Sequence, residues 1–349
     1  MITIRQPLSF TEIGQKDNQE DYLFPSRADE ETRVFIMCDG MGGHDNGEVA
    51  SMTAANALGN YLSSCSAIDI PVFETGLAKA YDALDKIDTN SMKKPGTTMA
   101  CLCLNENNYL VAHIGDSRIY HIRPSLYNSE TKRGGILYQS SDHSLVNDLL
   151  KAGELTEEEA KDFPQKNVIT RAMQPHLTKR YKSDVYMFDD IQNGDYFFLC
   201  CDGVLEQMSN EKLCEILADK KLTDELKLEA IKSVCDGKTR DNYTCWLIPI
   251  DKVKIQKDSS VSAVIKAKEE SVVITPAKIN ENTSYNLVKV AANFRKRWIS
   301  RIMSQKMLKI SSIKINYKHL PKWIWWIVGL LLSVVMLWMV MKKFNICLC

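Results

Sequence analysis

The run Phe35-Ile-Met-Cys38 leads into Asp39-Gly40, and the run Phe197-Phe-Leu-Cys-Cys201 leads into Asp202-Gly203. Each is an apolar segment of strand length that stops at an Asp followed by a Gly. Such a strand holds the carboxylate at a rigid edge, and the glycine lets the backbone turn sharply and come close to whatever the Asp binds. The repetition predicts two strands that deliver carboxylates to one shared ligand.

Further acidic residues stand beside other short apolar segments. Asp116 follows Val111-Ala-His-Ile-Gly115, Asp241 shortly precedes the run 244–248, and Glu20-Asp21 follows Asn18. Mg²⁺ and Mn²⁺ take oxygen ligands, and two such ions bridged by one carboxylate can share a water, lower its pKa and hold it in line with a phosphorus atom. We therefore predict a carboxylate-rich site for hard divalent cations.

Charge is distributed unevenly along the 349 residues, whose 45% hydrophobic content is that of a globular protein. Residues 282–349 carry twelve Lys or Arg and no Asp or Glu, so a net charge of 0 divides into +12 for this tail and −12 for the rest. The acidic part suits cation binding, and the basic tail suits an anionic membrane surface.

The eleven cysteines include no Cys-x-x-Cys pair, and most lie in apolar, strand-like runs. We expect them to be small buried hydrophobes in a reducing cytosol, and a zinc site built on paired ligands is disfavoured. The first residues lack the features of a signal peptide, so we expect residue 1 to stay in the cytosol.

The segment Trp323–Met341 is nineteen residues without a charge, with tryptophans towards both ends and lysines on both sides. As a helix it would span roughly 28 Å, which predicts a transmembrane helix in preference to a buried core helix. Nine Lys or Arg lie between Arg295 and Lys322. The positive-inside bias therefore predicts a single-pass, tail-anchored membrane protein with residues 1–322 in the cytoplasm and a short extracytoplasmic tail, 342–349.

Between a catalytic domain, residues 1–250, and this helix lies a linker and basic juxtamembrane segment, 251–322. From Val290 onward it has amphipathic spacing, which suits packing on lipid headgroups or on the catalytic domain. Within the catalytic domain we predict helices over 47–62 and 72–87. Strands over 97–104, 109–114 and 117–122 follow them, so antiparallel sheets with outer helices, an α+β architecture, are expected.

The acidic residues belong to an ordered series of short motifs. Together they resemble the metal-dependent protein serine/threonine phosphatases (PPM, type 2C), in their bacterial form, over residues 9–250. The motifs are Asn18-Gln-Glu-Asp21, Asp39-Gly-Met-Gly-Gly-His44, Gly96-Thr-Thr98, Gly115-Asp-Ser-Arg118, Asp142-His-Ser144, Asn167-Val-Ile-Thr-Arg171, Asp202-Gly203 and Asp241-Asn242.

The resemblance implies a four-layer sandwich of two central antiparallel β-sheets flanked by helices, with Mn²⁺ or Mg²⁺ at one edge between the sheets. Asp39 would bridge two ions, with the Gly40 carbonyl on one of them. Asp202 and Asp241 would bind the other. The remaining implied ligands are Asp21 with Glu20, directly or through water, and Asp116 at a third, weaker ion.

Two positions depart from the family's pattern. Lys16 stands where an Arg usually grips the substrate phosphate, which keeps the charge and loses the bidentate fork. Met41 stands where animal members have a His proposed as general acid. On paper His44, His113 and His143 are candidates for that role, although a lone His near a strand also serves as a structural donor.

The resemblance implies a protein phosphatase acting directly on phosphoserine and phosphothreonine without a phospho-enzyme, in a monomeric catalytic domain opposed by a cognate kinase. Residues 144–170 would form a flap beside the site. A phosphoprotein-binding adaptor of weak or no activity is the alternative, motivated by Lys16. A phosphodiesterase or nuclease is disfavoured, and no nucleic-acid partner is expected, because the bases are concentrated in the tail.

Overall fold

The computed structural model describes residues 1–42, 46–87, 94–161, 163–165 and 168–253, all within the compact unit Met1–Val261. Nearly all of the predicted linker and juxtamembrane segment, and the whole of the transmembrane helix and tail, lie outside the described residues. Within the described part, no helix combines the length and apolarity that a bilayer crossing requires.

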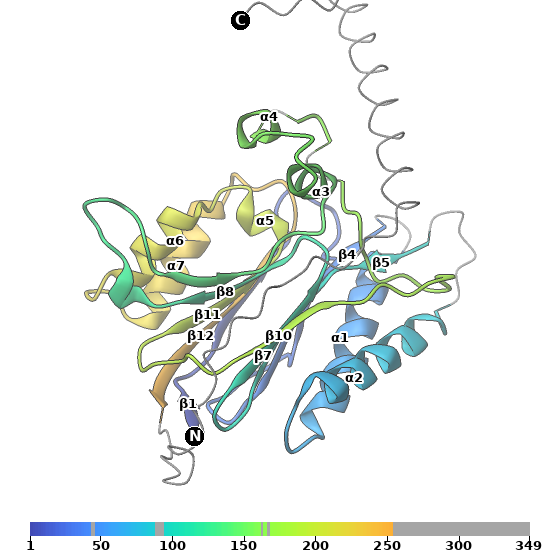
Figure 1. The fold of residues 1–349 in the computed structure, drawn as a ribbon, viewed down its shortest axis with the longest axis horizontal. Helices are drawn as coiled ribbons and strands as arrows, with labels where there is room; N and C mark the ends of the chain where they lie inside the picture. The colour runs from blue at the N-terminus through green and yellow to red at the C-terminus, as the bar shows by residue number, and fades with distance from the viewer. Residues whose placement is uncertain (43–45, 88–93, 162, 166–167, 254–349) are drawn as a thin grey trace, which may run out of the picture. The chain divides into compact units, whose positions relative to one another are not determined.

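Two six-stranded antiparallel sheets stack face to face (Figure 1). The first, which we call the β12 sheet, has the order β1 (Ile2–Ile4), β12 (Tyr243–Val253), β11 (Tyr196–Cys200), β8 (Arg118–Ile122) and β9 (Ile136–Gln139), with β2 (Leu8–Glu12) also on β12. The second, the β4 sheet, has the order β10 (Asp184–Phe188), β7 (Tyr109–Ile114), β6 (Met99–Leu104), β4 (Val34–Met41) and β3 (Asp21–Phe24), with β5 (Gly96–Thr97) also on β4.

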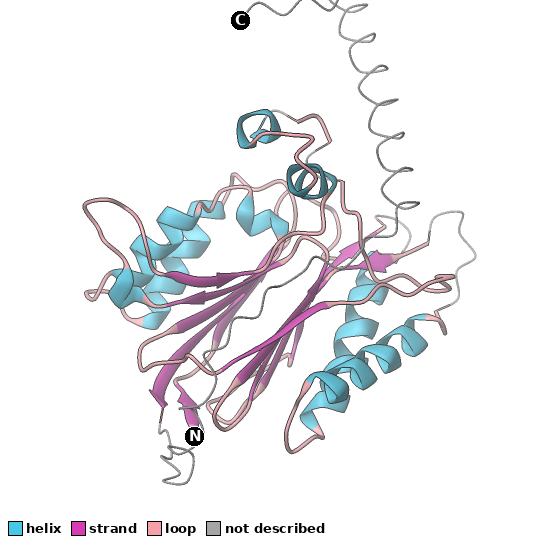
Figure 2. Ribbon diagram, in the orientation of Figure 1, coloured by secondary structure: helices cyan, strands magenta, loops and turns pink. Residues whose placement is uncertain are grey.

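Helices cover the outer face of each sheet (Figure 2). α1 (Gly47–Ser63) and α2 (Ile70–Leu84) pack on the β4 sheet, and α5 (Asp202–Leu205), α6 (Asn210–Ala218) and α7 (Asp224–Cys235) lie beside the β12 sheet. α3 (Leu145–Lys151) and α4 (Glu157–Lys161) stand at the end of the sandwich where β5 and α5 also lie, and η2 (Pro124–Leu126) follows β8. The expected four-layer architecture is confirmed.

The alternation of side chains along β4 explains its unbroken apolar run. Phe35 and Met37 belong to the core between the two sheets, whereas Ile36 and Cys38 belong to the core under α1 and α2. All four are fully buried. A strand covered on both faces needs apolar residues at every position, because successive side chains point to opposite faces.

Local sequence signals at the start of α2 agree with the structure. In α2, the Asp69 side chain accepts a hydrogen bond from the Val72 amide at 2.9 Å and Pro71 stands in the first turn. The turn between β6 and β7 is closed by the Asn105 amide, which donates to the Asn108 carbonyl at 2.9 Å.

The prediction that both Cys-Asp-Gly runs end at their Asp is wrong for the first copy. β4 continues through Asp39 to Met41, because Gly40 and Met41 pair with Thr97 and Gly96 of β5. Asp202, in contrast, is the first residue of α5. The two copies therefore present their carboxylates from different local structures.

Candidate metal centre

The two sheets bring their acidic residues to one place. Asp21 and Asp39 are directly opposite each other on β3 and β4. An oxygen of each lies within 4.8 Å of the other and of Cys201 Sγ, and Cys201 directly follows β11 of the β12 sheet. The cluster thus spans the space between the sheets, as the paired motifs predicted.

The other predicted acids reach the same centre from chain turns. Asp202 opens α5, Asp241 immediately precedes Asn242 at the start of β12, and Asp116 lies where the chain crosses from β7 in one sheet to β8 in the other. Burial, and then the charges of Asp21, Asp202, Asp116 and Asp241, raise the pKa of Asp39. The four other carboxylates therefore all act on Asp39.

Burial and mutual repulsion raise the pKa values of the other acids as well. Burial raises the pKa of Asp21 to about 7, with Asp202 and Asp241 adding to the effect and contacts to Thr244 and Cys201 opposing it. Burial and Asp202 raise the pKa of Asp116 to about 7, and burial and Asp241 raise that of Asp202 to about 6. Repulsion among these acids therefore adds to the cost of burying them.

Buried oxygens without partners show what the cluster fits. The side chains of Asp21 and Asp116 are 6% and 8% exposed, and both oxygens of Asp21 and Oδ1 of Asp116 accept no hydrogen bond of good geometry within the described protein. A buried carboxylate without a partner is costly. Divalent cations with a preference for oxygen satisfy such groups, so this set of residues fits Mn²⁺ or Mg²⁺.

Close packing of the backbone around position 40 leaves no room for a side chain there. A Cβ at this position would lie 2.4 Å from the Gly47 carbonyl oxygen and 2.5 Å from the Glu20 carbonyl oxygen. The Gly40 amide donates to that same Glu20 carbonyl at 3.1 Å, and Ser51 Oγ donates to it at 2.6 Å. The glycine therefore lets β4, the start of α1 and the Glu20 backbone meet beside the carboxylates.

Asn242 ties the acidic segments together, a role that sequence reasoning did not assign although the Asp241-Asn242 motif was noted. Its Nδ2 donates to the Ile13 and Asn18 carbonyls, both at 2.9 Å, and its Oδ1 accepts from the Glu20 amide at 2.8 Å. Asn242 is 3% exposed. It thereby holds the Glu20-Asp21 segment against the start of β12.

Lys16 lies at the rim of the cluster. Its Nζ is 2.9 Å from Asp241 Oδ1, and the side chain is about half exposed at 46%. Burial works to lower the pKa of Lys16, but the hydrogen bond and charge of Asp241, with the charges of Glu20 and Asp39, outweigh it and raise the pKa. A fixed cation thus borders the acidic centre on its solvent side.

His113 and His143 lie behind the Asp116 turn. His143 Nδ1 accepts from the Gly115 amide at 3.1 Å, the His143 amide donates to the Gly115 carbonyl at 2.9 Å, and His143 Nε2 lies 3.3 Å from Asp184 Oδ2. His113 Nε2 lies 2.9 Å from the Ser141 carbonyl. Since the two side chains are 1% and 2% exposed, both act as structural donors and acceptors and not as acids for a leaving group. His44 is outside the described residues.

The same histidines do not form a second metal site with Asp184. Their rings are stacked with 4.6 Å between centroids and 9° between planes, so one ion cannot lie in the plane of both rings. Arg171 Nη1 already stands 3.2 Å from His143 Nε2 and 3.2 Å from Asp184 Oδ1. The guanidinium supplies the positive charge there.

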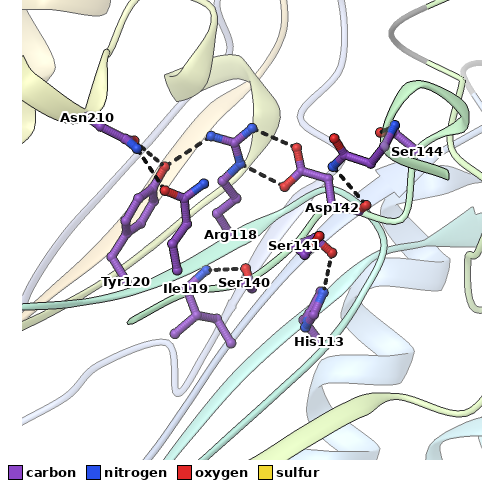
Figure 3. Close-up of polar contacts among 11 residues, drawn as sticks. His113, Arg118, Ile119, Tyr120, Ser140, Ser141, Asp142, Ser144 and Asn210 are labelled. Atoms are coloured by element: carbon purple, nitrogen blue, oxygen red, sulfur yellow. Dashed lines mark hydrogen bonds and ion pairs between the residues drawn. The ribbon is translucent and has the colours of Figure 1, made fainter. Parts of the chain in front are cut away.

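A polar network fixes the segment 140–144 that leads into the flap (Figure 3). Arg118 binds Asp142 through two hydrogen bonds of 2.7 Å and also donates to Tyr120 Oη at 3.2 Å. The C-terminal end of the flap, residues 144–170, is hydrogen-bonded to this segment: the Thr170 amide donates to the His143 carbonyl at 2.8 Å. The two motifs around Asp116 and Asp142 therefore form one rigid support.

Comparison with known proteins agrees with this architecture. The sequence profile of the family Protein phosphatase 2C matches residues 11–228. A putative protein phosphatase 2C-type of Streptococcus pyogenes serotype M6 is 33% identical over 250 residues, which cover 68% of this chain and 94% of that protein. Protein phosphatase PhpP of Streptococcus pneumoniae is 31% identical over 263 residues, or 69% of this chain and 96% of that one.

Solved structures share the fold. The serine/threonine phosphatase of S. agalactiae is 28% identical, with a TM-score of 0.58 and coverage of 71% of this chain and 99% of that one. The catalytic domain of PstP, solved in complex with 2 manganese ions, has the same TM-score of 0.58 at 24% identity, with 72% of this chain and 100% of that one covered. The chain therefore has the fold of the bacterial serine/threonine phosphatases. The chain belongs to the protein phosphatase 2C family.

Proposed function

We propose that this protein is a metal-dependent phosphatase that removes phosphate from serine and threonine residues of proteins. The observation that carries the proposal is the acidic centre around Asp39, on which the charges of Asp21, Asp202, Asp116 and Asp241 act, with buried oxygens of Asp21 and Asp116 that accept no hydrogen bond of good geometry within the described protein. The names of similar proteins support the substrate class: PhpP is a protein phosphatase, and stp of Listeria monocytogenes, 29% identical over 237 residues, is a serine/threonine phosphatase.

We assign the ligands as the family resemblance suggests. Asp39 would be shared by two ions of Mn²⁺ or Mg²⁺; the Gly40 carbonyl would help to hold the first, and Asp202 and Asp241 would hold the second. Asp21, with Glu20 beside it, would hold the first ion directly or through water. Asp116 would help to hold a third, weaker ion. When bound, the ions supply an activated water for direct attack on phosphorus and neutralise charge on the phosphate.

Lys16 contacts the substrate phosphate in this proposal. Its ammonium already lies 2.9 Å from Asp241 Oδ1, at the rim where a phosphate would enter. An ammonium is a point charge without the planar fork of a guanidinium, so it attracts the phosphate and orients it less strictly than Arg. Asn242 and Gly40 have a positioning role in this proposal, because they hold the acidic segments in place before any ligand binds.

Phosphate release from a phosphothreonine peptide tests the proposal. We expect release that requires Mn²⁺, stops on addition of a chelator and is lost in Asp39→Asn. Asp189→Asn, a change of the same kind at an exposed position, should retain it. Bound Mn²⁺ without phosphate release would instead favour the alternative function, a phosphoprotein-binding adaptor.

We further propose that residues 323–341 anchor the protein in a membrane with the catalytic domain, residues 1–250, in the cytoplasm, where a cognate kinase would phosphorylate its substrates. The apolar run and its basic flank support this proposal. The full chain should sediment with membranes at moderate salt, and a chain ending at Lys322 should be released. Full-length protein that stays in the supernatant would refute the anchor.

A further inference from the structure

A thiol lies inside the carboxylate centre. Cys201 Sγ stands with one oxygen each of Asp21 and Asp39 in a group whose atoms are all within 4.8 Å of one another. Cys201 is fully buried. Mn²⁺ and Mg²⁺ prefer oxygen ligands, so the proposed phosphatase chemistry has no need of a sulfur at this point.

The position of the sulfur is determined by the backbone of the neighbouring strand. The Thr244 amide donates to Cys201 Sγ at 3.1 Å, and Sγ donates to the Asn242 carbonyl at 3.4 Å. Cys38, in the other Cys-Asp-Gly copy, belongs instead to the core under α1 and α2. Of the two repeated cysteines, Cys201 is the one that joins the acids.

Asp21, which is also a proposed ligand of Mn²⁺ or Mg²⁺, is a second sign that this group holds a cation. Its side chain is 6% exposed, and neither carboxylate oxygen accepts a hydrogen bond of good geometry within the described protein. Zinc binds sulfur and oxygen ligands in tetrahedral sites, often with three ligands from the protein. Two carboxylates and one thiolate whose ligand atoms lie within 4.8 Å of one another match such a site. Cadmium has a still stronger preference for sulfur and gives a spectroscopic signal.

We propose that Cys201, Asp21 and Asp39 form a mixed sulfur and oxygen site for a thiophilic divalent cation, Zn²⁺ or Cd²⁺, within the metal centre. As the bond between sulfur and the ion forms, the S–H bond breaks and its proton leaves to a buffer base. Zn²⁺ binds nitrogen, oxygen and sulfur sites more tightly than Mn²⁺ does. Because the site uses Asp39, an ion held there competes with the Mn²⁺ pair and inhibits phosphate release; this consequence rests on the proposed function.

The test is a Cd²⁺ titration of the metal-free, full-length protein in detergent, followed by the ultraviolet charge-transfer band of a cadmium–thiolate bond. Cys347 and Cys349 are replaced by Ser in every protein, so that the thiols of the tail do not contribute. We expect a thiolate band at one equivalent of Cd²⁺, which Zn²⁺ abolishes by competition. Cys201→Ser should lose the band and bind Cd²⁺ at least about tenfold more weakly.

Cys200→Ser is the matched control, since Cys200 is the adjacent, equally buried thiol and should leave the band intact. Equal Cd²⁺ binding and an unchanged band in Cys201→Ser would overturn the proposal. If Cys201→Ser does not fold, X-ray absorption at the zinc edge of the Zn²⁺-loaded parent protein decides. One sulfur ligand supports the site, and a shell of oxygen and nitrogen alone refutes it.

These measurements are independent of catalysis. A protein that releases phosphate with Mn²⁺ but shows no Cys201-dependent band refutes the soft-metal site and leaves the phosphatase proposal standing. A Cys201-dependent band in a protein that releases no phosphate supports the soft-metal site and refutes the phosphatase proposal.

Discussion

Replacing His143 by Asn and by Gln separates the roles of its two ring nitrogens. Asn places an amide oxygen close to the position of Nδ1, which accepts from the Gly115 amide at 3.1 Å. Gln reaches the position of Nε2, which lies 3.3 Å from Asp184 Oδ2. Burial, His113 and Arg171 lower the pKa of His143 to about 4, so the imidazole is neutral at neutral pH and the comparison does not depend on its charge.

The structure predicts that Gln is the more damaging change. With Gln, the buried Gly115 amide has no acceptor, which costs about 1–3 kcal/mol. With Asn, the longer contact to Asp184 is lost, and this costs about 0.5 kcal/mol because Asp184 is 31% exposed and still binds Arg171. Both variants lose the imidazole ring, so this loss does not distinguish them. The difference between the two costs is about 0.5–2.5 kcal/mol. For a domain of this size, 1 kcal/mol corresponds to about 2–4 °C, so we expect Gln to melt roughly 1–10 °C below Asn.

Thermal unfolding of the metal-free protein measures this difference, and Leu at position 143, which lacks both polar contacts, provides the lower limit. A second readout is the Mn²⁺ concentration for half-maximal phosphate release. Because Gly115 precedes Asp116, the Gln variant should need more Mn²⁺ than the Asn variant. Equal melting temperatures and equal Mn²⁺ requirements for Asn and Gln would show that the Gly115 hydrogen bond does not support the Asp116 turn.

Three further outcomes are expected. Gly115→Ala should destabilise the fold by at least about 2 kcal/mol in denaturant unfolding, because Gly115 has a φ of +106° and a Cβ would lie 2.6 Å from the Thr98 side chain; a loss below about 0.5 kcal/mol would contradict this. Lys16→Ala should raise KM for a phosphopeptide while changing stability by less than about 1 kcal/mol, since its ion pair is half exposed. An unchanged KM would remove Lys16 from the phosphate site. The raised pKa values of Asp21 and Asp116, about 7 each, stabilise the metal-free protein below about pH 4, and this contribution is lost as the pH rises through 7. The metal-free melting temperature should therefore fall between pH 5.5 and 8, and the increase produced by Mn²⁺ should grow over the same range; a flat profile without metal would argue against repulsion among these acids.

Much of the fold could be predicted from local patterns. The helix that begins after Asp69 has a side-chain cap and a proline in its first turn, and its predicted range, 72–87, is close to the observed α2. Residues 144–170 contain similar local signals: Thr156 and Glu159 exchange the hydrogen bonds of a capping box, and Gly153 adopts a φ of +69°. These features depend on neighbours within a few residues, which is why the sequence alone reveals them.

Other features depend on contacts between distant segments. β4 continues past Asp39 because β5, almost sixty residues later, pairs with its last residues. The linkage of residues 13, 18 and 20 by Asn242 spans more than two hundred residues, and no local pattern predicts it. The sequence has no Cys-x-x-Cys pair, and only sheet packing brings the single Cys201 beside two carboxylates from the other sheet.

By itself, the sequence determined the strand and helix pattern, the acid-only set of candidate ligands and the division into an acidic region and a basic tail, because these follow from residue type, spacing and count. Tertiary structure decided how the repeated Cys-Asp-Gly motif is used. Packing against opposite layers places Cys38 under the helices and Cys201 among the carboxylates. The physical reason is that a strand specifies which residues share a face, whereas the partner that covers each face is set by sheet pairing across the whole chain.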